Sequence, residues 1–240
     1  MQYEIISQTP QKAFIHMKKT SVALANTIRR AIISQEPSFA VDEVDFYENN
    51  SAFYNEYLAS RIGLVPLTFD DGVSSDARIS LTLNVQGPGL VLSKDLVSSD
   101  PAVKPVNDDF PIADLAEGQR LRLEAWAVSG TAKKHAKFQA ATASYMYYPE
   151  FTLKKTNAAK EFLAKLPKRI LNDKGEVDAW HSDVIEEFLE RNPDSGEYKY
   201  KDGEFIFMIE SYNNVTPLEH FKHALEIVKK EASEARKQLA

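Results

Sequence analysis

The sequence predicts an α+β fold, and three features of its patterning support this. Apolar residues recur at helical spacing over residues 21–34 and again from Leu218 to Leu239. Apolar and polar residues alternate over several stretches between residues 45 and 150, as in half-buried strands. Clusters of Asp, Ser, Gly and Pro separate these stretches and mark turns. We therefore expect helices at both ends of the chain and a β-rich region between them.

The first predicted helix covers residues 21–34. The hydroxyl of Ser21 or Thr20 can cap it by accepting a backbone N–H of its first turn. A second apolar patch, Val22 and Ile33, lies beside the main apolar face. A helix that is apolar on more than one side usually packs against its own sheet and against something else. The main face consists of Leu24, Ala25, Ile28, Ala31 and Ile32.

Short strands are expected on either side of this helix. Residues 3–7 and 13–18 predict a hairpin before it, and residues 42–47 predict a strand after it, followed by a short helix that ends near residues 61–67. Strict alternation at Ile79, Leu81, Leu83 and Val85 predicts another strand. Further strands are predicted at residues 90–92, 103–106, 121–128 and 140–148.

Residues 151–201 form a third segment that contains helices. Helical patterns cover residues 157–166 and 183–190, and residues 172–175 predict a turn. We expect this segment to have a small apolar core of its own. That core would comprise Phe162, Leu166, Ile170, Trp180, Ile185, Phe188 and Leu189.

The last part of the chain predicts a turn at residues 201–203, a strand at residues 204–211 and a long helix. Thr216, Pro217 and Glu219 have the spacing of a capping box with proline at the first helical position. The apolar residues of the helix recur at alternating intervals of about three and four residues, which is the 3.5-residue period of a seam that packs on another helix. The seam consists of Leu218, Phe221, Leu225, Val228, Ala232, Ala235 and Leu239.

Composition excludes several classes of protein. The 240 residues include no cysteine, which excludes disulfides, thiolate nucleophiles and cysteine-ligated metal centres. A net charge of −6 argues against a large non-specific nucleic-acid surface. No stretch reaches the roughly 20 apolar residues of a membrane span, and no secretory signal is visible, so we expect a cytoplasmic protein.

No convincing catalytic constellation is present in the sequence. His220 and His223 lie three residues apart beside Glu219, but the spacing suggests no third metal ligand. Residues 130–138 form a basic loop that is either a solvated surface element or an anion-binding patch. Its glycine content is too low for a loop that cradles phosphate with several backbone N–H groups.

Several ordered motifs resemble a known family. These are ALANTIRRAI at residues 23–32, DEVDFYEN at 42–49, ASRIGLVPL at 59–67, HAKF at 135–138, and FIFMIES at 205–211 followed by PLEHF. In this order and spacing they resemble the alpha-like assembly subunits of DNA-directed RNA polymerase. The archaeal D form is the most similar; the bacterial alpha amino-terminal domain and the eukaryotic third subunit are its relatives. One departure is the stretch at residues 212–214, where the family usually has a glycine.

The resemblance implies a division of the chain into three domains. Residues 1–44 and 202–240 would form a discontinuous dimerisation domain, an antiparallel sheet with two helices. Residues 45–150 would be a β-rich insert domain. Residues 151–201 would occupy the position of a ferredoxin-like domain that holds an iron–sulfur cluster in many archaeal relatives. Because this chain has no cysteine, we expect neither a cluster nor any other cofactor.

The resemblance also implies partners. The helical seam would bind the small L subunit to give a heterodimer, which would recruit the small N and P subunits and then the second-largest catalytic subunit. The residues expected at the interface with the L-like subunit are Leu24, Ile28, Phe221, Leu225, Val228 and Ala232. Those expected to contact a large subunit are Arg29, Arg30, Lys134, His135 and Lys137.

Two functions from different classes follow. The first is a non-catalytic assembly subunit: the polymerase is a nucleotidyltransferase complex, but this chain would supply none of its catalytic carboxylates and would make little or no contact with nucleic acid or membrane. The alternative is a stand-alone α+β module that binds an anion through the basic loop at residues 130–138. Its weakness is that no nucleophile, base or metal set converges with that loop in the sequence.

Overall fold

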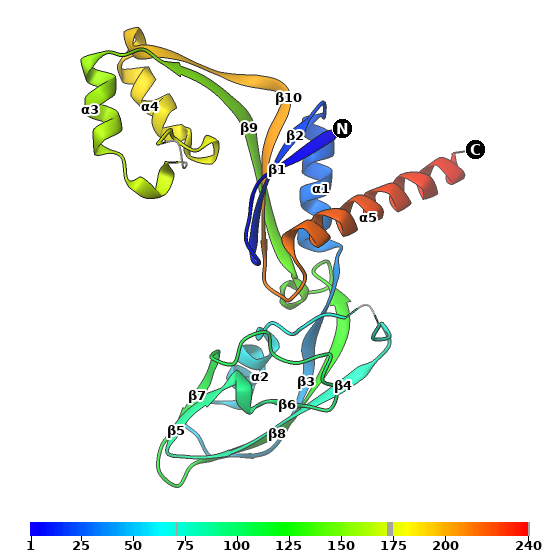
Figure 1. Ribbon diagram of the computed structural model, residues 1–240. Coiled ribbons are helices and arrows are strands. Elements are labelled where there is room, and N and C mark those ends of the chain that lie inside the picture. The colour runs from blue at the N-terminus through cyan, green and yellow to red at the C-terminus, as the bar shows by residue number, and fades with distance from the viewer. Residues whose placement is uncertain (71, 172–174, 240) are drawn as a thin grey trace. The chain divides into compact units, whose positions relative to one another are not determined.

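The computed structural model describes residues 1–70, 72–171 and 175–239 (Figure 1). The fold is α+β, with antiparallel pairing in the sheets and five α-helices among the described residues. The chain divides into two compact units. The first unit comprises Met1–Thr9, Ala13–Thr27 and Ser144–Met208, and the second comprises Pro10–Lys12, Ile28–Ala143 and Ile209–Ala240.

A four-stranded sheet begins with the predicted hairpin, and its strand order is β1-β2-β10-β9. The hairpin strands β1 (Gln2–Gln8) and β2 (Lys12–Lys18) are antiparallel, with Ile5 opposite Ile15. All seven residues of β1 are exposed, whereas β2 carries several buried residues. The other two strands, β9 (Ala141–Leu153) and β10 (Gly196–Ser211), are both longer than the sequence predicts.

Strand β10 corrects one expectation. Residues 201–203 were expected to form a turn, but the strand continues through them. Gly203 adopts a positive φ of 68°, which glycine tolerates without a Cβ clash, and its carbonyl accepts a hydrogen bond from the Thr20 N–H at 3.1 Å. The glycine therefore bends a continuous strand here and does not end it.

Helix α1 (Val22–Ser34) forms where its apolar periodicity predicts it. The Ser21 hydroxyl accepts the backbone N–H of Leu24 at 3.2 Å, so Ser21 supplies the cap. Ala25, Ile28 and Ala31 are fully buried. The chain then passes directly into β3 (Pro37–Asn49), which starts earlier than the strand expected at residues 42–47 because proline is tolerated at the first position of a strand.

The second unit contains a sheet with the order β3-β8-β4-β6. Its other strands are β4 (Arg78–Gln86), β6 (Val97–Ser98) and the long β8 (Arg120–Thr131). A separate pair, β5 (Gly89–Leu92) and β7 (Pro111–Leu115), lies in the same unit, as does helix α2 (Asn55–Gly63). The alternating residues Ile79, Leu81 and Leu83 of β4 all point into one apolar cluster with Leu58 and Ile62 of α2. Alternation therefore predicted the buried face of β4 correctly.

The strand expected at residues 103–106 is wrong. The structure has only an isolated bridge there, between Leu67 and Pro105. Pro101 and Pro105 carry no backbone N–H and cannot donate to a ladder, so this apolar stretch contributes buried Val103 without strand pairing.

The third segment has the two predicted helices, α3 (Asn157–Lys165) and α4 (Asp183–Arg191), and the Thr156 hydroxyl caps α3 through the Ala159 N–H at 3.1 Å. Of the predicted core, Trp180 packs edge-on against Phe14, with ring centroids 5.0 Å apart. Residues 172–174 of the expected turn lie outside the described residues. Other predicted core residues meet in one apolar cluster: Phe162, Leu166, Ile185, Phe188 and Leu189.

Helix α5 (Pro217–Gln238) begins with the predicted capping box. The Thr216 hydroxyl accepts the Glu219 N–H at 3.4 Å, and the Glu219 carboxylate accepts the Thr216 N–H at 2.9 Å. The hydrogen bonds from Thr216 lower the pKa of Glu219. Within the described part of the chain, no helix combines the length and apolar character needed to cross a membrane.

Candidate functional site

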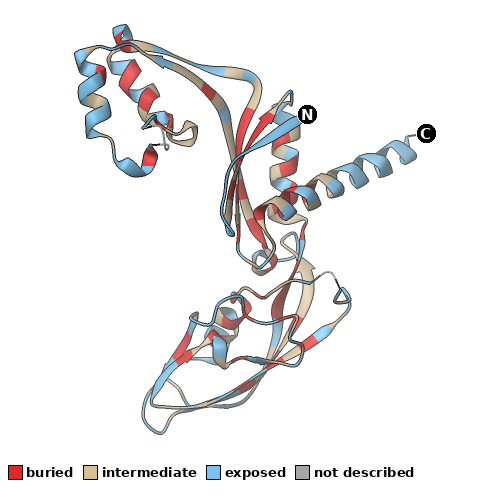
Figure 2. Cartoon of the chain, viewed as in Figure 1, coloured by how far each residue is buried: buried red, intermediate tan, exposed pale blue. Residues whose placement is uncertain are grey.

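The apolar face of α5 changes from buried to exposed along its length. At its beginning His220, Phe221 and Ala224 are buried. Leu225 and Val228 are only partly covered, and every residue from 229 to 239 is exposed, as the pale blue end of α5 in Figure 2 shows. The seam predicted from the heptad spacing is therefore uncovered over its second half.

Helix α1 places its predicted interface residues at different depths. Ile28 is fully buried within the chain, as is Phe221 of α5, so neither reaches the surface of the isolated chain. Leu24 is partly exposed and Ala232 is exposed. Of the arginine pair, Arg29 is partly buried and Arg30 is exposed. Leu24, Arg30 and the exposed half of α5 are thus the parts of the prediction that a partner can touch directly.

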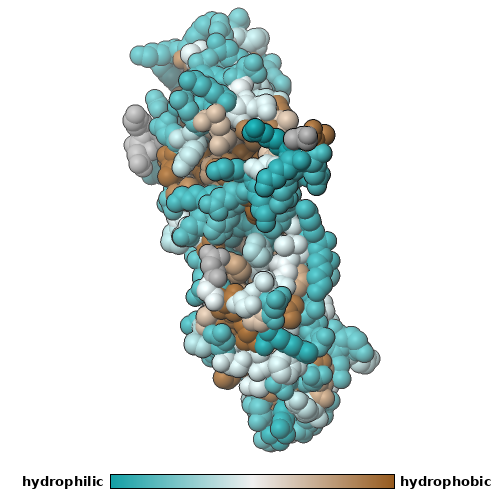
Figure 3. Space-filling view, turned by 90° about the vertical axis from the view of Figure 1, so that its right-hand side faces the viewer, coloured by the Kyte–Doolittle hydropathy of each residue, from teal (hydrophilic) through white to brown (hydrophobic). Residues whose placement is uncertain are grey.

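Exposed apolar side chains also occur elsewhere on the chain. Tyr54, Leu64 and Val97 are 82%, 61% and 65% exposed in the second unit. The face drawn in Figure 3 shows apolar areas, in brown, between larger hydrophilic ones. Single exposed apolar side chains are common on protein surfaces, so these three residues alone do not mark a binding site.

A buried polar pair connects the start of β3 to the start of α5. Glu36 is 3% exposed and His220 is 1% exposed, and the His220 Nδ1 is hydrogen-bonded to the Glu36 carboxyl. The other ring nitrogen, Nε2, lies 3.1 Å from the Ser211 hydroxyl. The sequence does not reveal this pairing, because Glu36 is far from His220 in the chain. The sequence pattern suggested only that His220 and His223 could be two ligands of a metal site that lacks a third.

The Ser211 hydroxyl assigns the tautomer of His220. The hydroxyl donates its single proton to the carbonyl oxygen of Val215, its nearest acceptor at 2.7 Å. The ring nitrogen Nε2 must then carry a proton and donate it to the Ser211 oxygen. Burial raises the pKa of Glu36, while the hydrogen bond from His220 opposes that shift. A hydrogen bond thus joins the buried Glu36 carboxyl to the His220 Nδ1.

Serine, histidine and glutamate are connected here in the order used by nucleophilic triads. In this chain the Ser211 side chain is buried, and its hydroxyl is held by the Val215 carbonyl. The geometry therefore fixes the turn between β10 and α5, and it accounts for both ring nitrogens of His220 without a metal.

The basic element at residues 130–138 is held against β3 by one carboxylate. Lys134 Nζ lies 3.3 Å from Asp42 Oδ2, and Lys137 is bonded to Asp42 Oδ1. Both ammonium groups also lie over the Phe138 ring, 5.4 and 5.2 Å from its centroid. The hydrogen bonds from Lys137 and Lys134 lower the pKa of Asp42. The three residues predicted from this element, Lys134, His135 and Lys137, thus lie together, and Asp42 joins them.

Gly130 explains how the basic element packs so closely. A Cβ at this position would lie 2.8 Å from the ring of Phe138, which is fully buried. Phe138 in turn accepts a hydrogen bond at its carbonyl from the Ser38 hydroxyl at 2.6 Å. Residues 130 and 138 therefore anchor the two ends of the element on β8 and β3.

The third segment lacks the ligands of an iron–sulfur cluster, because such a cluster requires thiolates and the chain has no cysteine. The described residues also contain no group of three or more His, Cys, Asp or Glu side chains that could hold a metal ion. The third segment is instead held together by the apolar cluster around Phe162 and Phe188, whose rings stack with centroids 4.3 Å apart.

The sequence is similar to known RNA polymerase subunits. Residues 52–146 match the RNA polymerase Rpb3/RpoA insert domain. A DNA-directed RNA polymerase subunit Rpo3 from Pyrococcus horikoshii is 43% identical over 173 residues, which cover 69% of this chain and 67% of the relative. The subunit of the same name from Pyrobaculum aerophilum is 37% identical over 87% of this chain and 84% of the relative. That from Methanosarcina acetivorans is 31% identical over 98% and 96%.

These similarities, with the α+β fold, define an alpha-like, non-catalytic assembly subunit of RNA polymerase and confirm that prediction. The chain belongs to the Rpo3 family of archaeal DNA-directed RNA polymerase subunits. The alternative of a stand-alone anion-binding module receives no support from the comparisons.

Proposed function

We propose that this chain is the platform on which an archaeal RNA polymerase assembles, and that its first partner is a small L-like subunit. The observation that carries the proposal is the uncovered seam of α5. Leu225 and Val228 are partly exposed, and Ala232 and Leu239 are exposed, although all four lie at the seam positions of a regular heptad. A helix from a partner that covered this seam would bury these residues and give a heterodimer.

The interface is proposed to have two layers. Leu24, Leu225, Val228 and Ala232 contact the L-like subunit directly. Ile28 and Phe221, both buried, support that surface from below. Each of the six predicted residues thus keeps a proposed role, direct or supporting according to its burial.

We propose that the chain is divided into three domains. Residues 1–44 and 202–240 form the dimerisation domain, residues 45–150 the insert domain, and residues 151–201 the third domain. The match of residues 52–146 to a known insert domain supports the second boundary pair. The separate apolar cluster of the third segment supports its treatment as a domain without a cofactor.

The basic element and the arginine pair are proposed to contact a large subunit. Arg30 is exposed, and Lys134 and His135 are exposed beside partly covered Lys137. Arginine and lysine in such positions form charge-assisted hydrogen bonds with carboxylates of a partner. We propose the second-largest catalytic subunit as that partner, with the small N and P subunits recruited to the same platform. The assembled enzyme would act in the cytoplasm, and this chain would make little or no contact with nucleic acid.

The proposal is tested by affinity purification of the tagged chain from its native cell. We expect the complete RNA polymerase to copurify in stoichiometric amounts, and co-expression with the L-like subunit alone to give a soluble 1:1 complex. A tagged chain that elutes as a stable monomer, indifferent to the L-like subunit, would contradict the proposal.

A further inference from the structure

A groove runs alongside β3 in the second unit. It consists of two adjoining cavities of about 520 and 350 Å³, and both are lined by Leu64 and Lys137. The larger cavity borders Ser38 and Phe39, and the smaller one borders Asp42 and Val44. We refer to the two cavities together as the β3 groove. At about 3.3 Å per residue, the strand from residue 38 to residue 44 spans about 20 Å, so the groove has the length of a short extended peptide.

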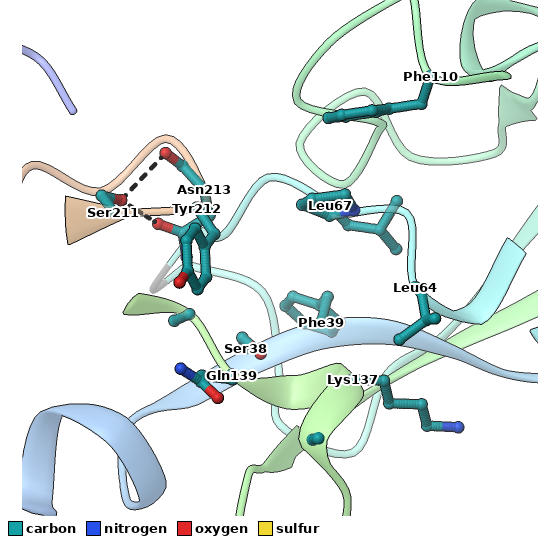
Figure 4. A pocket seen from close by; sticks show the side chains of 13 residues that line it. Ser38, Phe39, Leu64, Leu67, Phe110, Lys137, Gln139, Ser211, Tyr212 and Asn213 are labelled. Carbon is teal, nitrogen blue, oxygen red and sulfur yellow. Dashed lines mark hydrogen bonds between the residues drawn. The ribbon is translucent and has the colours of Figure 1, made fainter. Parts of the chain in front are cut away.

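The two walls of the larger cavity differ in chemistry, as Figure 4 shows. Phe39, Leu67 and Phe110 form an apolar wall, with Leu64 at its edge. Tyr212 and Asn213 stand opposite. Leu64 is 61% exposed, so its side chain offers apolar surface to an incoming group.

The polar wall has an unused donor. The Asn213 Oδ1 accepts a hydrogen bond from the Val215 N–H at 3.0 Å. Its Nδ2 is buried and has no hydrogen-bond partner among the residues that the structure describes. A buried amide donor without an acceptor is unfavourable, so the hydrogen bonding of this wall is incomplete in the isolated chain.

The end of the groove that contains the smaller cavity, next to the basic element, carries positive charge. Among the described residues, no carboxylate lines the larger cavity, and Asp42 is the single carboxylate that lines the smaller one. Asp42 is shared by Lys134 and Lys137, and Lys133 is exposed nearby in sequence. One carboxylate facing two ammonium groups leaves a positive excess, which is complementary to an acidic side chain.

We propose that the β3 groove binds an extended segment of another polymerase subunit, in which a large apolar side chain is followed within a few residues by an acidic one. The apolar side chain enters the cavity beside Leu64 and Phe39. The acidic side chain lies beside Lys134 and Lys137. This inference rests on the proposed function, because the segment is supplied by the assembled polymerase.

Photo-crosslinking in the purified polymerase tests the inference. A benzophenone amino acid replaces Leu64 in one preparation and Leu90 in another; Leu90 is the matched control, a leucine of β5 in the same unit that is 56% exposed. After irradiation, crosslinked peptides are identified by mass spectrometry. We expect position 64 to yield one predominant peptide from another subunit, with an acidic residue close to an apolar one, and position 90 not to yield that peptide.

A charge reversal extends the test. Lys134→Glu should lower the crosslink yield at position 64 by about two- to five-fold, the effect of losing one exposed ion pair. Lys94→Glu, an exposed lysine outside the groove, should leave the yield unchanged. Equal losses in the two variants would overturn the charge complementarity and with it the inference.

The remaining outcomes are distinct. An intact polymerase that gives no crosslink from position 64 above the position-90 control overturns the groove inference alone. A crosslink to a second copy of this chain, or to a segment without an acidic residue, also overturns it. Failure of the chain to copurify with polymerase overturns the proposed function, and the groove inference falls with it.

Discussion

Glu36 and His220 are 184 positions apart in the chain, yet their side chains are bonded to each other in the interior of the second unit. Glu36 lies between α1 and β3, and His220 lies in the first turn of α5. The pair therefore fixes where the proposed interface helix α5 begins. A change at either residue should alter the position of the helix as well as the stability of the chain.

Removing the Glu36 carboxyl should be costly. Glu36→Ala leaves a buried ring nitrogen of His220 without a partner, and we expect the free energy of unfolding to fall by about 1–3 kcal/mol. Glu36→Gln retains a hydrogen-bonding group and should lose less. Urea unfolding of the purified heterodimer measures both. Glu43→Ala, which removes an exposed carboxylate from β3, is the control and should change stability little; equal effects of the Glu36→Ala and Glu43→Ala variants would contradict the structural role.

The same pair predicts a pH dependence. Burial raises the pKa of Glu36 above its ordinary value of 4.5. The folded chain then holds a proton that the unfolded chain releases, so this group's contribution to stability falls as pH rises from about 4.5 towards the raised folded pKa. The slope of unfolding free energy against pH should be smaller in Glu36→Gln. An unchanged slope would show that another group titrates.

Asp42 should act in the opposite direction. Its lowered pKa means that its ion pairs with Lys137 and Lys134 stabilise the folded chain above the unfolded pKa of about 3.8 and that this contribution is lost as pH falls through the lower folded value. Asp42→Asn should reduce stability at pH 7 by at most about 1 kcal/mol, because the group is partly solvated. The difference from the parent chain should shrink at high salt and at low pH. Thermal unfolding of both chains at low and at high salt concentration measures this difference. A stability difference that does not shrink at high salt would contradict the role of the ion pairs.

Gly130 should not tolerate a side chain. In Gly130→Ala the new methyl group would press on the buried Phe138 ring, and overpacking of this kind costs about 1–3 kcal/mol. Because Phe138 holds the basic element in place, the amides of residues 133–137 should exchange faster with solvent. Gly63→Ala is the matched control, since its Cβ would be 3.4 Å from the Val41 carbonyl, an ordinary contact. Similar exchange rates in the two variants would contradict the anchoring role of Phe138.

The seam should tolerate charge in the free chain but not in the heterodimer. Leu225→Asp with Val228→Asp places two carboxylates on partly exposed positions of α5, so we expect the chain to fold and heterodimer formation with the L-like subunit to be lost. Glu226→Lys, on the exposed face, serves as the control and should still form the complex. Size-exclusion chromatography with light scattering distinguishes the two results, and a persistent pair with both aspartates would exclude the seam as the interface.

Local patterns in the sequence predicted local structure well. The cap and apolar face of α1, the alternation of β4 and the capping box of α5 all follow from spacings of about four residues or fewer. The two wrong secondary-structure predictions involve glycine and proline, residue types that occur in more than one kind of backbone structure. Gly203 bends a strand where a turn was expected, and Pro105 keeps an apolar stretch out of a ladder.

The candidate sites were predictable only where their residues are close in sequence. Lys134, His135 and Lys137 were found together because one short element carries them. Their partner Asp42 is 95 positions from Lys137, and the Glu36–His220 pair spans a still longer interval, so only the folded chain brings them together. Leu64 was recognised as part of a motif, but its exposure depends on how α2 ends.

The exposed end of α5 has a consequence for the order of assembly. Its last ten residues, 229–238, have no buried side chain, and helices shorter than about 12 to 15 residues are marginal in water without packing. These turns should therefore exchange their amides rapidly in the free chain and slowly once the seam is covered. Assembly would then contribute part of the folding of this subunit, and a cell that made it without its partner would contain a chain whose carboxy-terminal turns are open to proteases.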